Sequence, residues 1–420
     1  MLGLLKDNGY TITEDLSEAD LIVVNTCTFI EKAKAESINT ILEVAQYKED
    51  GTCKGLIVAG CLSQQYQDEL FQEIPEIDAL IGTGAWDQVM VAVDAIEHGN
   101  RSCIMENITN IYDERMPRIQ TTPRYSAYVK IADGCNNCCT FCAIPYIRGR
   151  FESRPMEDII EEVKKLAKSG YKEIILIAQD TTKYGIDIYG KPKLAELLKK
   201  LCKIDGIKWI RFLYAYPETI DDKLIKVVKK NEKICKYFDI PIQHISDSVL
   251  KRMNRKSNSE SIELLIKKLR EKIPNVIIRT TVMVGFPGET QEDFEKLCNF
   301  VESAKFDKLG AFAYSKEEGT PAAKLKEQVH PMTKKARYNK IMEIQQKVSE
   351  ENLNKYIGKQ LEVLVEGKTI DGKYYVCRSY MDVPDIDGLI YLNNSKELKI
   401  GDFVKCTIKS SINEYDLLGE

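Results

Sequence analysis

Short apolar segments alternate with amphipathic helical segments along most of this chain, and this rhythm is the strongest constraint on its fold. Between residues 123 and 354 we predict six strands, with helical patterns between them: Ala127–Ala132, Glu173–Ala178, Trp209–Tyr214, Phe238–Pro241, Val276–Val284 and Lys308–Tyr314. Repeated βα units build a parallel sheet, because parallel strands need a crossover connection. Six units favour an open (β/α) barrel over a doubly wound sheet, and in either fold ligands bind at the carboxyl ends of the strands.

Two helices of this region have recognisable start signals. Ser257 and Glu260 have the spacing of a capping box ahead of an amphipathic helix over residues 257–273. Thr290 follows Gly288 and is expected to cap a second helix with an apolar face.

Residues 1–122 carry a shorter version of the same alternation. We predict parallel strands and helices over the following segments: Leu21–Val24, Gly55–Gly60 and Asp78–Gly82 for the strands, and Glu31–Gln46, Gln64–Phe71 and Trp86–Glu97 for the helices. Residues 2–8 have the pattern of the second half of a helix that ends at Gly9. A helix that leads into a parallel strand normally follows an earlier strand. We therefore expect the first βα unit to be missing from this chain, with the authentic start upstream of Met1.

Residues 355–420 have a different pattern, which predicts a small all-β barrel. Glycine and Asp-Gly turns separate short strand-like runs at Gln360–Glu366, Lys373–Arg378, Leu389–Leu392 and Phe403–Ile408. The sequence thus predicts an α/β protein of three domains: a parallel α/β domain at 1–122, an open (β/α) barrel at 123–354 and an all-β barrel at 355–420.

Composition restricts the setting in which the chain works. With 44% hydrophobic and 30% charged residues and a net charge of −4, wholesale disorder is excluded. The apolar runs fall far below the roughly 18 residues of a membrane span, and the start lacks the features of a secretory signal. The thirteen cysteines cannot all pair internally, and four of them lie within eight residues. This usage indicates a reducing cytoplasm, with thiols kept for metal binding or catalysis and no membrane partner.

The four clustered cysteines lie in the loop after the first predicted barrel strand. Cys135, Cys139 and Cys142 have the spacing C-x3-C-x2-C. Three thiolates on one tight loop can bind three corners of a cubane iron–sulfur cluster and leave one iron open. A zinc site needs four ligands, and the two abutting C-x2-C pairs cannot easily wrap one tetrahedral ion. Buried or disulfide-bonded cysteines are the remaining alternative.

This loop, with Phe141 before Cys142, resembles that of the radical S-adenosylmethionine enzymes. The continuation Ala143–Arg150 and the Ser-Arg-Pro at 153–155 are similar to the methylthiotransferase branch. The three-region layout matches that branch along the whole chain, and the last barrel is similar to the TRAM module. Within the branch, residues 178–185 and 239–247 resemble the RimO type, which modifies an aspartate of a small-subunit ribosomal protein.

The resemblance implies a cofactor set and a reaction. Cys135, Cys139 and Cys142 would hold a 4Fe–4S cluster whose open iron takes S-adenosylmethionine, and one electron would then release a 5′-deoxyadenosyl radical. A sulfur donor and a second S-adenosylmethionine would complete methylthiolation at the β-carbon of an aspartate in a ribosomal protein of the uS12 type, with flavodoxin or ferredoxin as electron donor. Cys138 departs from the family, which usually has a basic residue there. We expect it to be a bystander.

Family members also carry three cysteines in the first domain, which bind a second 4Fe–4S cluster. Cys27 and Cys61 match two of them, and each follows a buried strand, so both point to one sheet edge. The third would lie in the missing first βα unit. Without it, assembly of the second cluster is in doubt. Taken alone, these two cysteines are also compatible with small buried hydrophobic residues.

Further cofactor contacts follow from position at the ends of strands. Gly285 and Gly288 resemble the glycine turn that contacts S-adenosylmethionine in the family, and Gln179 and Gln243 are polar candidates for its ribose or amino-acid part. Acidic residues outnumber basic ones in the last barrel, which suits a basic ribosomal protein better than tRNA. A tRNA adenosine methylthiotransferase remains an alternative, as does a non-catalytic ribosome-binding or zinc protein with the same fold.

Overall fold

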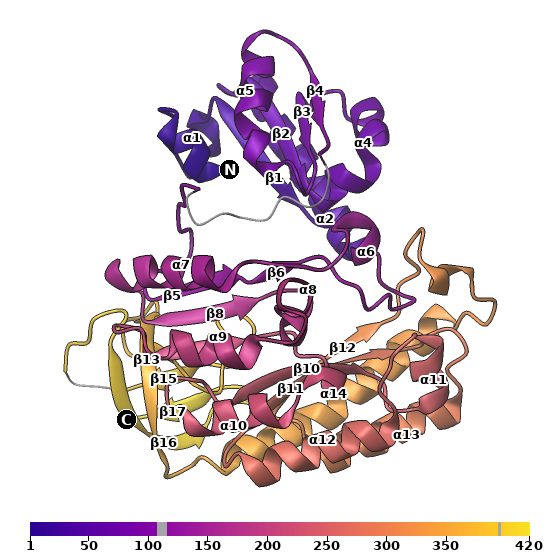
Figure 1. The fold of residues 1–420 in the computed structure, drawn as a ribbon, viewed down its shortest axis with the longest axis vertical. Coiled ribbons are helices and arrows are strands. Elements are labelled where there is room, and N and C mark those ends of the chain that lie inside the picture. The colour runs from indigo at the N-terminus through magenta and orange to yellow at the C-terminus, as the bar shows by residue number, and fades with distance from the viewer. Residues whose placement is uncertain (107–115, 394–395) are drawn as a thin grey trace. The chain divides into compact units, whose positions relative to one another are not determined.

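The computed structural model describes residues 1–106, 116–393 and 396–420, which form two compact units (Figure 1). Unit 1 comprises Met1–Thr121, Ala132–Arg154 and Ser315–Lys324. Unit 2 comprises Thr122–Ile131, Pro155–Tyr314 and Leu325–Glu420. The three predicted domains and their boundaries stay predictions.

A four-stranded parallel sheet forms the centre of unit 1. Its strands follow the order β1 (Leu21–Thr26), β2 (Gly55–Gly60), β3 (Ala79–Ile81) and β4 (Ser102–Ile104). Helices α2 (Glu31–Ala45) and α4 (Cys61–Glu73) enclose one apolar core against the sheet, and α1 (Leu2–Asp7) and α5 (Val89–Glu97) enclose a second. Since both faces of the strands are covered, β2 is apolar over nearly its whole length.

The start of unit 1 agrees with the sequence pattern. Helix α1 ends just before Gly9, whose φ of +91° is the left-handed conformation that glycine tolerates best. Unit 1 also contains a short antiparallel pair, β6 (Ala132–Asp133) with β7 (Glu152–Ser153). The segment between these two strands carries the clustered cysteines and α6 (Ile144–Ile147).

Six parallel strands of unit 2 confirm the (β/α) architecture. One sheet joins β5 (Ser126–Lys130), β8 (Glu173–Ile177) and β9 (Trp209–Phe212), and another joins β10 (Tyr237–Gln243), β11 (Ile277–Val284) and β12 (Lys308–Ala313). A parallel bridge joins Ile210 of β9 to Ile234, in the segment just before β10. All six strands occur where the sequence predicts them, with ends displaced by no more than two residues.

Helices of unit 2 follow these strands in the order of a βα repeat: α7 (Met156–Lys168), α8 (Ile186–Tyr189), α9 (Leu194–Leu201), α10 (Asp222–Lys230), α11 (Asp247–Arg252), α12 (Ser259–Lys272), α13 (Gln291–Ala304) and α14 (Pro331–Asn354). Thr290 caps α13 as predicted, because its hydroxyl accepts a hydrogen bond from the Asp293 amide. The predicted capping box of α12 is wrong. Asn258, rather than Ser257, caps this helix and pairs reciprocally with Ser261, since an asparagine side chain one residue later reaches the free amide.

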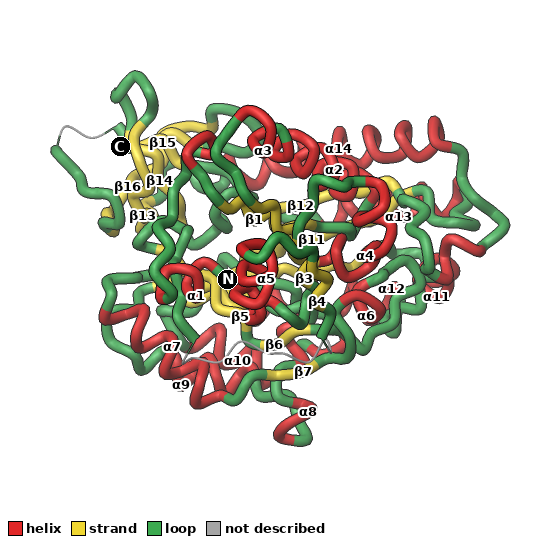
Figure 2. The backbone as a smooth tube through the Cα atoms, turned by 90° about the horizontal axis from the view of Figure 1, so that it is seen from above, coloured by secondary structure: helices red, strands yellow, loops and turns green. Residues whose placement is uncertain are grey.

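The last part of unit 2 is a closed five-stranded barrel, which confirms the predicted all-β barrel and adds one strand to the four predicted runs. Its strands follow the order β13 (Gln360–Lys368), β14 (Tyr375–Ser379), β15 (Ile390–Leu392), β17 (Leu417–Gly419) and β16 (Phe403–Ser411), and β16 returns to pair with β13. Figure 2 shows these strands gathered together. Among the described residues, no helix combines the length and the apolarity needed to cross a membrane.

The small barrel shares a core with the amino-terminal ends of the (β/α) strands. Glu173, the first residue of β8, is fully buried and accepts hydrogen bonds from Arg211 at 2.7 Å and from Arg378 of β14 at 2.6 Å. Arg211 also donates to the backbone oxygens of Ser379 and Tyr380. These contacts join the small barrel to the amino-terminal side of the strands.

Candidate iron–sulfur site

The loop with the three predicted cluster ligands is folded back tightly on its own hairpin. Gly134 begins it with a φ of +72°, and a Cβ atom there would lie 2.0 Å from the backbone oxygen of Arg150. The Cys135 amide donates to the oxygen of Gly149 at 3.2 Å. The Asn136 side chain accepts from the Phe151 amide at 3.1 Å. Glycine is therefore required at position 134 to let the two arms approach, and the Asn136 side chain links them.

The cysteines of this loop differ in exposure. Cys135 and Cys139 are buried, Cys142 is partly buried and Cys138 is exposed. Burial raises the pKa of the Cys142 thiol to about 12, and the neighbouring Cys139, Cys135 and Cys138 act in the same direction. The thiols are therefore near neighbours. Cys138 also has a positive φ of 51°, unlike the predicted ligands.

The donor set of this loop fits a cluster by its chemistry. Three thiols at the predicted spacing lie on one loop that is closed at both ends by β6 and β7. Within the described residues, no three His, Cys, Asp or Glu side chains are already arranged to hold a metal ion. Cluster binding would therefore require the thiols to turn toward a common centre, as the ligands of a cubane do.

Cys27 and Cys61 lie at the same edge of the unit 1 sheet, as expected. Strands β1 and β2 pair in register up to Thr26 and Gly60, and one cysteine follows each of these residues. Cys27 is exposed and Cys61 is buried. Burial raises the pKa of the Cys61 thiol, and Cys27 is among the groups that add to this effect. The two thiols are thus close enough to interact.

The two predicted ligand sets meet inside unit 1. Cys61 packs in one apolar cluster with Ala143 and Ile147, and Ala143 directly follows Cys142. Arg148 contacts the Cys61 sulfur at 3.5 Å and the Asp133 carboxylate at 3.3 Å. The structure therefore brings Cys61 next to the loop of Cys135, Cys139 and Cys142, and Phe141 belongs to the same unit.

The other predicted cofactor residues belong to unit 2, where they follow the carboxyl ends of strands. Gln179 lies two residues after β8, and its buried side-chain oxygen has no hydrogen-bond partner among the described residues. Gln243 ends β10 with a φ of +68°, beside β11. A buried acceptor without a donor is a feature that a bound polar ligand would satisfy.

The turn that contains Gly285 and Gly288 is fixed by residues that the sequence analysis did not identify. Glu289 accepts from the Phe286 amide at 3.0 Å and from Arg337 of α14 at 2.9 Å. Burial raises the pKa of Glu289, and Arg337 opposes this shift. No sequence pattern could indicate Arg337, because it reaches the turn from a helix about fifty residues further along the chain.

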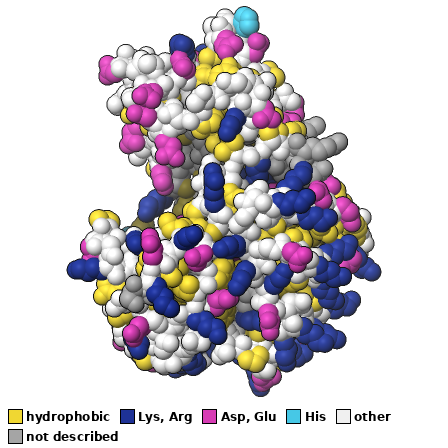
Figure 3. All heavy atoms as spheres, turned by 90° about the vertical axis from the view of Figure 1, so that its left-hand side faces the viewer, with side chains coloured by type: hydrophobic (Ala, Val, Ile, Leu, Met, Phe, Trp, Pro, Cys, Tyr) yellow, Lys and Arg dark blue, Asp and Glu magenta, His cyan; other side chains and the backbone are white. Residues whose placement is uncertain are grey.

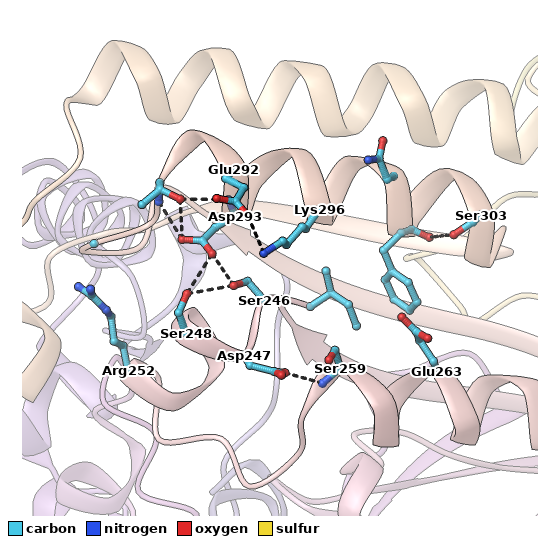
Figure 4. Close-up of a pocket in the computed structure, with 15 residues that line it drawn as sticks. Ser246, Asp247, Ser248, Arg252, Ser259, Glu263, Glu292, Asp293, Lys296 and Ser303 are labelled. Carbon is cyan, nitrogen blue, oxygen red and sulfur yellow. Dashed lines mark hydrogen bonds and ion pairs between the residues drawn. The ribbon is translucent and has the colours of Figure 1, made fainter.

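A pocket of about 890 Å³ lies beside this turn, between α11, α12 and α13 (Figure 4). Its lining is mixed in charge, and Asp293 accepts hydrogen bonds from Ser246 and Ser248. Of the predicted site residues only Gly288 lines it. This pocket is therefore not the site that the sequence predicts. The nearby His244 is fully buried, and burial lowers its pKa to about 4, so it is neutral at physiological pH.

Comparison with known families assigns all three regions of the chain. Residues 129–301 match the Radical SAM superfamily, residues 1–82 match the uncharacterized protein family UPF0004, and residues 357–420 match the TRAM domain.

Curated relatives match the whole chain at about half identity. The chain is 54% identical to the ribosomal protein uS12 methylthiotransferase RimO of Alkaliphilus oremlandii and covers 94% of it. Over its whole length it is also 51% identical to the protein of that name from Lachnoclostridium phytofermentans and 50% identical to the one from Clostridioides difficile, covering 95% and 94% of these relatives.

A solved structure with a similar fold is that of the radical S-adenosylmethionine methyltransferase TsrM from Kitasatospora setae, with cobalamin and a [4Fe-4S] cluster bound. The TM-score is 0.58 at 14% identity, and the match covers 76% of this chain and 69% of that protein. At this identity the similarity establishes the fold alone.

Proposed function

We propose a function from the premise that this chain belongs to the ribosomal protein uS12 methylthiotransferase family, RimO, within the radical S-adenosylmethionine enzymes. As a member it uses a 4Fe–4S cluster and S-adenosylmethionine. We propose that it methylthiolates the β-carbon of an aspartate in the small-subunit ribosomal protein uS12. The observation that carries this proposal is the 50–54% identity to uS12 methylthiotransferases over the entire chain.

The cysteine loop would hold the catalytic cluster. Cys135, Cys139 and Cys142 are the proposed ligands, and Cys138 is left outside because it is exposed with a left-handed backbone. A cluster bound there, together with S-adenosylmethionine, supplies one-electron chemistry that can remove a hydrogen atom from an unactivated C–H bond. The hairpin around Gly134 holds the loop, and the burial of Cys135 and Cys139 keeps water away from it.

The strand ends of unit 2 would bind S-adenosylmethionine. Gly285 and Gly288 have φ values of +70° and +79°, which glycine tolerates best, and the flexible side chains of Lys334 and Arg252 lie against the positions that Cβ atoms would take. Gln179 offers a buried oxygen that could accept a hydrogen bond from a ligand hydroxyl or amino group. Gln243 and Phe141 are further proposed contacts. Glu289 and Arg337 would keep the glycine turn in place.

A second cluster is proposed near Cys27 and Cys61. This proposal is supported by the position of both cysteines at one sheet edge and by the packing of Cys61 against Ala143. Two thiols of this chain would contribute to it, and a third ligand is not identified. A site for the sulfur donor next to the catalytic loop would allow sulfur transfer without a long movement of the substrate.

Substrate, electron donor and location follow from the same proposal. The substrate is uS12, free or on the ribosome, and flavodoxin or ferredoxin would supply the electron. The substrate and the electron donor both belong in the cytoplasm, where we place this protein.

Mass spectrometry of uS12 tests the proposed function. The chain is expressed in a bacterial strain that lacks its own uS12 methylthiotransferase, and uS12 and tRNA nucleosides are analysed together. We expect one aspartate of uS12 to gain the mass of one sulfur and one CH₂ group. The Cys142→Ala variant should give unmodified uS12.

Two other outcomes would replace the proposal. Unmodified uS12 with new methylthio-adenosine in tRNA would make this chain a tRNA methylthiotransferase. Colourless protein after anaerobic reconstitution, with bound zinc and no cleavage of S-adenosylmethionine, would favour a non-catalytic protein.

A further inference from the structure

Positive charge is concentrated in three short stretches of unit 2. Residues 164–172, 199–208 and 226–236 together contain thirteen lysines and two acidic residues, whereas the whole chain has a net charge of −4. Figure 3 shows lysine and arginine side chains gathered on the surface of unit 2. Such an asymmetry within an acidic protein indicates a local interaction surface rather than a general preference for basic residues.

The fold brings these three stretches to one side of the molecule. Each stretch covers the end of a barrel helix (α7, α9 or α10) and the loop that leads to the next strand. Helix α9 packs against both α7 and α10, so the three helices are neighbours. Because each helix runs antiparallel to its strand, all three helix ends lie at the end of the barrel opposite to the carboxyl ends of the strands.

Some of these lysines already serve the fold. Lys172 and Lys208 contact the small barrel through Asp402 and Glu362. Lys233 and Lys236 donate to the backbone oxygens of Ile204 and Asn231, in the loops that follow α9 and α10. These residues are therefore not available to a partner.

Six others remain exposed and make no ion pair within the part of the chain that the structure describes: Lys168, Lys199, Lys203, Lys226, Lys229 and Lys230. Lysines in the last turn of a helix stabilise its dipole, which could account for four of the six. Lys203 follows its helix and Lys226 lies in the middle of α10. Of the four longest helices, α2, α13 and α14 have no basic residue in their last turn, whereas α12 has Arg270 and Lys272. Helix stabilisation therefore does not explain the whole set.

We propose that these six lysines, hereafter the lysine surface, bind the phosphate backbone of RNA. The surface is made of lysine alone, so it offers point charges to phosphates rather than the bidentate contacts that read base edges. Binding should therefore be independent of sequence and governed by salt. An RNA contact at this end of the barrel would hold the enzyme on a ribonucleoprotein and would leave the carboxyl ends of the strands to the protein substrate.

This inference rests on the proposed function for its biological meaning, because a ribosomal protein is presented among ribosomal RNA. Binding of RNA itself requires neither cluster nor S-adenosylmethionine. The two claims can therefore fail separately.

Fluorescence anisotropy of a labelled single-stranded RNA oligonucleotide, titrated with the full-length protein at several salt concentrations, tests the proposal. Each phosphate contact on single-stranded nucleic acid contributes about −0.7 to the slope of log K against log salt, so six contacts predict a slope of about −4. The variant Lys226→Gln, Lys229→Gln, Lys230→Gln removes three contacts and should reduce the slope to about −2.

A matched variant controls for the loss of net charge. Lys335→Gln, Lys340→Gln, Lys347→Gln neutralises three exposed lysines of α14 and should leave the slope unchanged. Circular dichroism of both variants checks that the fold is retained. The variant with Lys226→Gln, Lys229→Gln and Lys230→Gln in α10 should modify a free uS12 peptide as efficiently as the unaltered protein does.

Three results would overturn the proposal. One is the absence of salt-dependent RNA binding. Another is an equal change of slope in both triple variants. The third is tighter binding to phosphatidylglycerol vesicles than to RNA, which would assign the lysine surface to a membrane.

Discussion

Replacing Glu173 by glutamine should destabilise unit 2 strongly, because this carboxylate is the only acidic partner within hydrogen-bond reach of Arg211 among the described residues. The side chains of Glu173, Arg211 and Arg378 are essentially inaccessible to water. Glutamine keeps the shape but removes the negative charge. Removing one partner of a buried ion pair leaves an uncompensated charge and costs about 3–5 kcal/mol.

The pKa of Glu173 gives a second route to this magnitude. Burial opposes ionisation, but Arg378 and Arg211 outweigh it and lower the pKa to about 2 from an ordinary value of 4.5. A folded pKa below the unfolded one adds stability at neutral pH, which is lost as the pH falls from about 4.5 to about 2. A shift of this size corresponds to about 3 kcal/mol, in agreement with the first figure.

Tryptophan fluorescence in urea is a suitable assay. The chain has two tryptophans, and Trp209 is buried in unit 2 with its ring 4.7 Å from that of Phe403 in the small barrel. In a Trp86→Phe background, Trp209 alone reports on the junction between the small barrel and the (β/α) strands. The urea midpoint of the Glu173→Gln protein should lie clearly below that of the parent at pH 7, and the difference should shrink as the pH falls toward about 2.

A surface pair provides the control. Glu362 contacts Lys208 at 3.3 Å with about half of each side chain exposed. The change Glu362→Gln should cost less than about 1 kcal/mol, as exposed pairs do. If Glu173→Gln had an equally small effect, the buried network would not hold the two parts of unit 2 together, and the reasoning would be refuted.

Three further predictions concern the cofactor residues. Arg337→Ala leaves Glu289 buried without its cation. It should weaken binding of S-adenosylmethionine, measured by calorimetry, about tenfold, a loss of about 1.4 kcal/mol, with the iron content unchanged. An unaltered affinity would mean that Arg337 does not hold the glycine turn in its binding conformation. Gly134→Ala forces a Cβ atom into a backbone oxygen at 2.0 Å and should abolish iron loading of the catalytic loop, whereas full loading would mean that the hairpin relaxes easily. Cys138→Ser should retain the iron that Cys139→Ser loses, and equal losses would make Cys138 a ligand.

Strand positions could be predicted from the sequence because each buried parallel strand is a nearly continuous apolar run. Short strands were missed where the run is too short to carry a pattern, as in Ser102–Ile104 and Leu417–Gly419. The capping box of α12 was misplaced by one residue, because Ser257 and Asn258 are both good caps and only the backbone path decides between them.

The cysteine loop could be identified from spacing alone, since ligands on one short loop leave a local signature. Contacts between distant segments leave none. Arg148 meets Cys61 across more than eighty residues, and Arg337 meets Glu289 across nearly fifty. Equally, nothing in the sequence indicates that the segment after Cys142 packs against Cys61, because this contact depends on where the fold places the two segments.

The central claim is that unit 1 holds both iron–sulfur clusters of a methylthiotransferase. The most direct test counts iron and acid-labile sulfide in anaerobically reconstituted protein in which Cys135, Cys139 and Cys142 are replaced by alanine. We expect about eight irons in the unaltered chain and about four in this variant, with the remainder lost when Cys27 and Cys61 are also replaced. Iron near zero in the triple variant would contradict the claim, because the catalytic loop would then hold the only cluster that this chain can build.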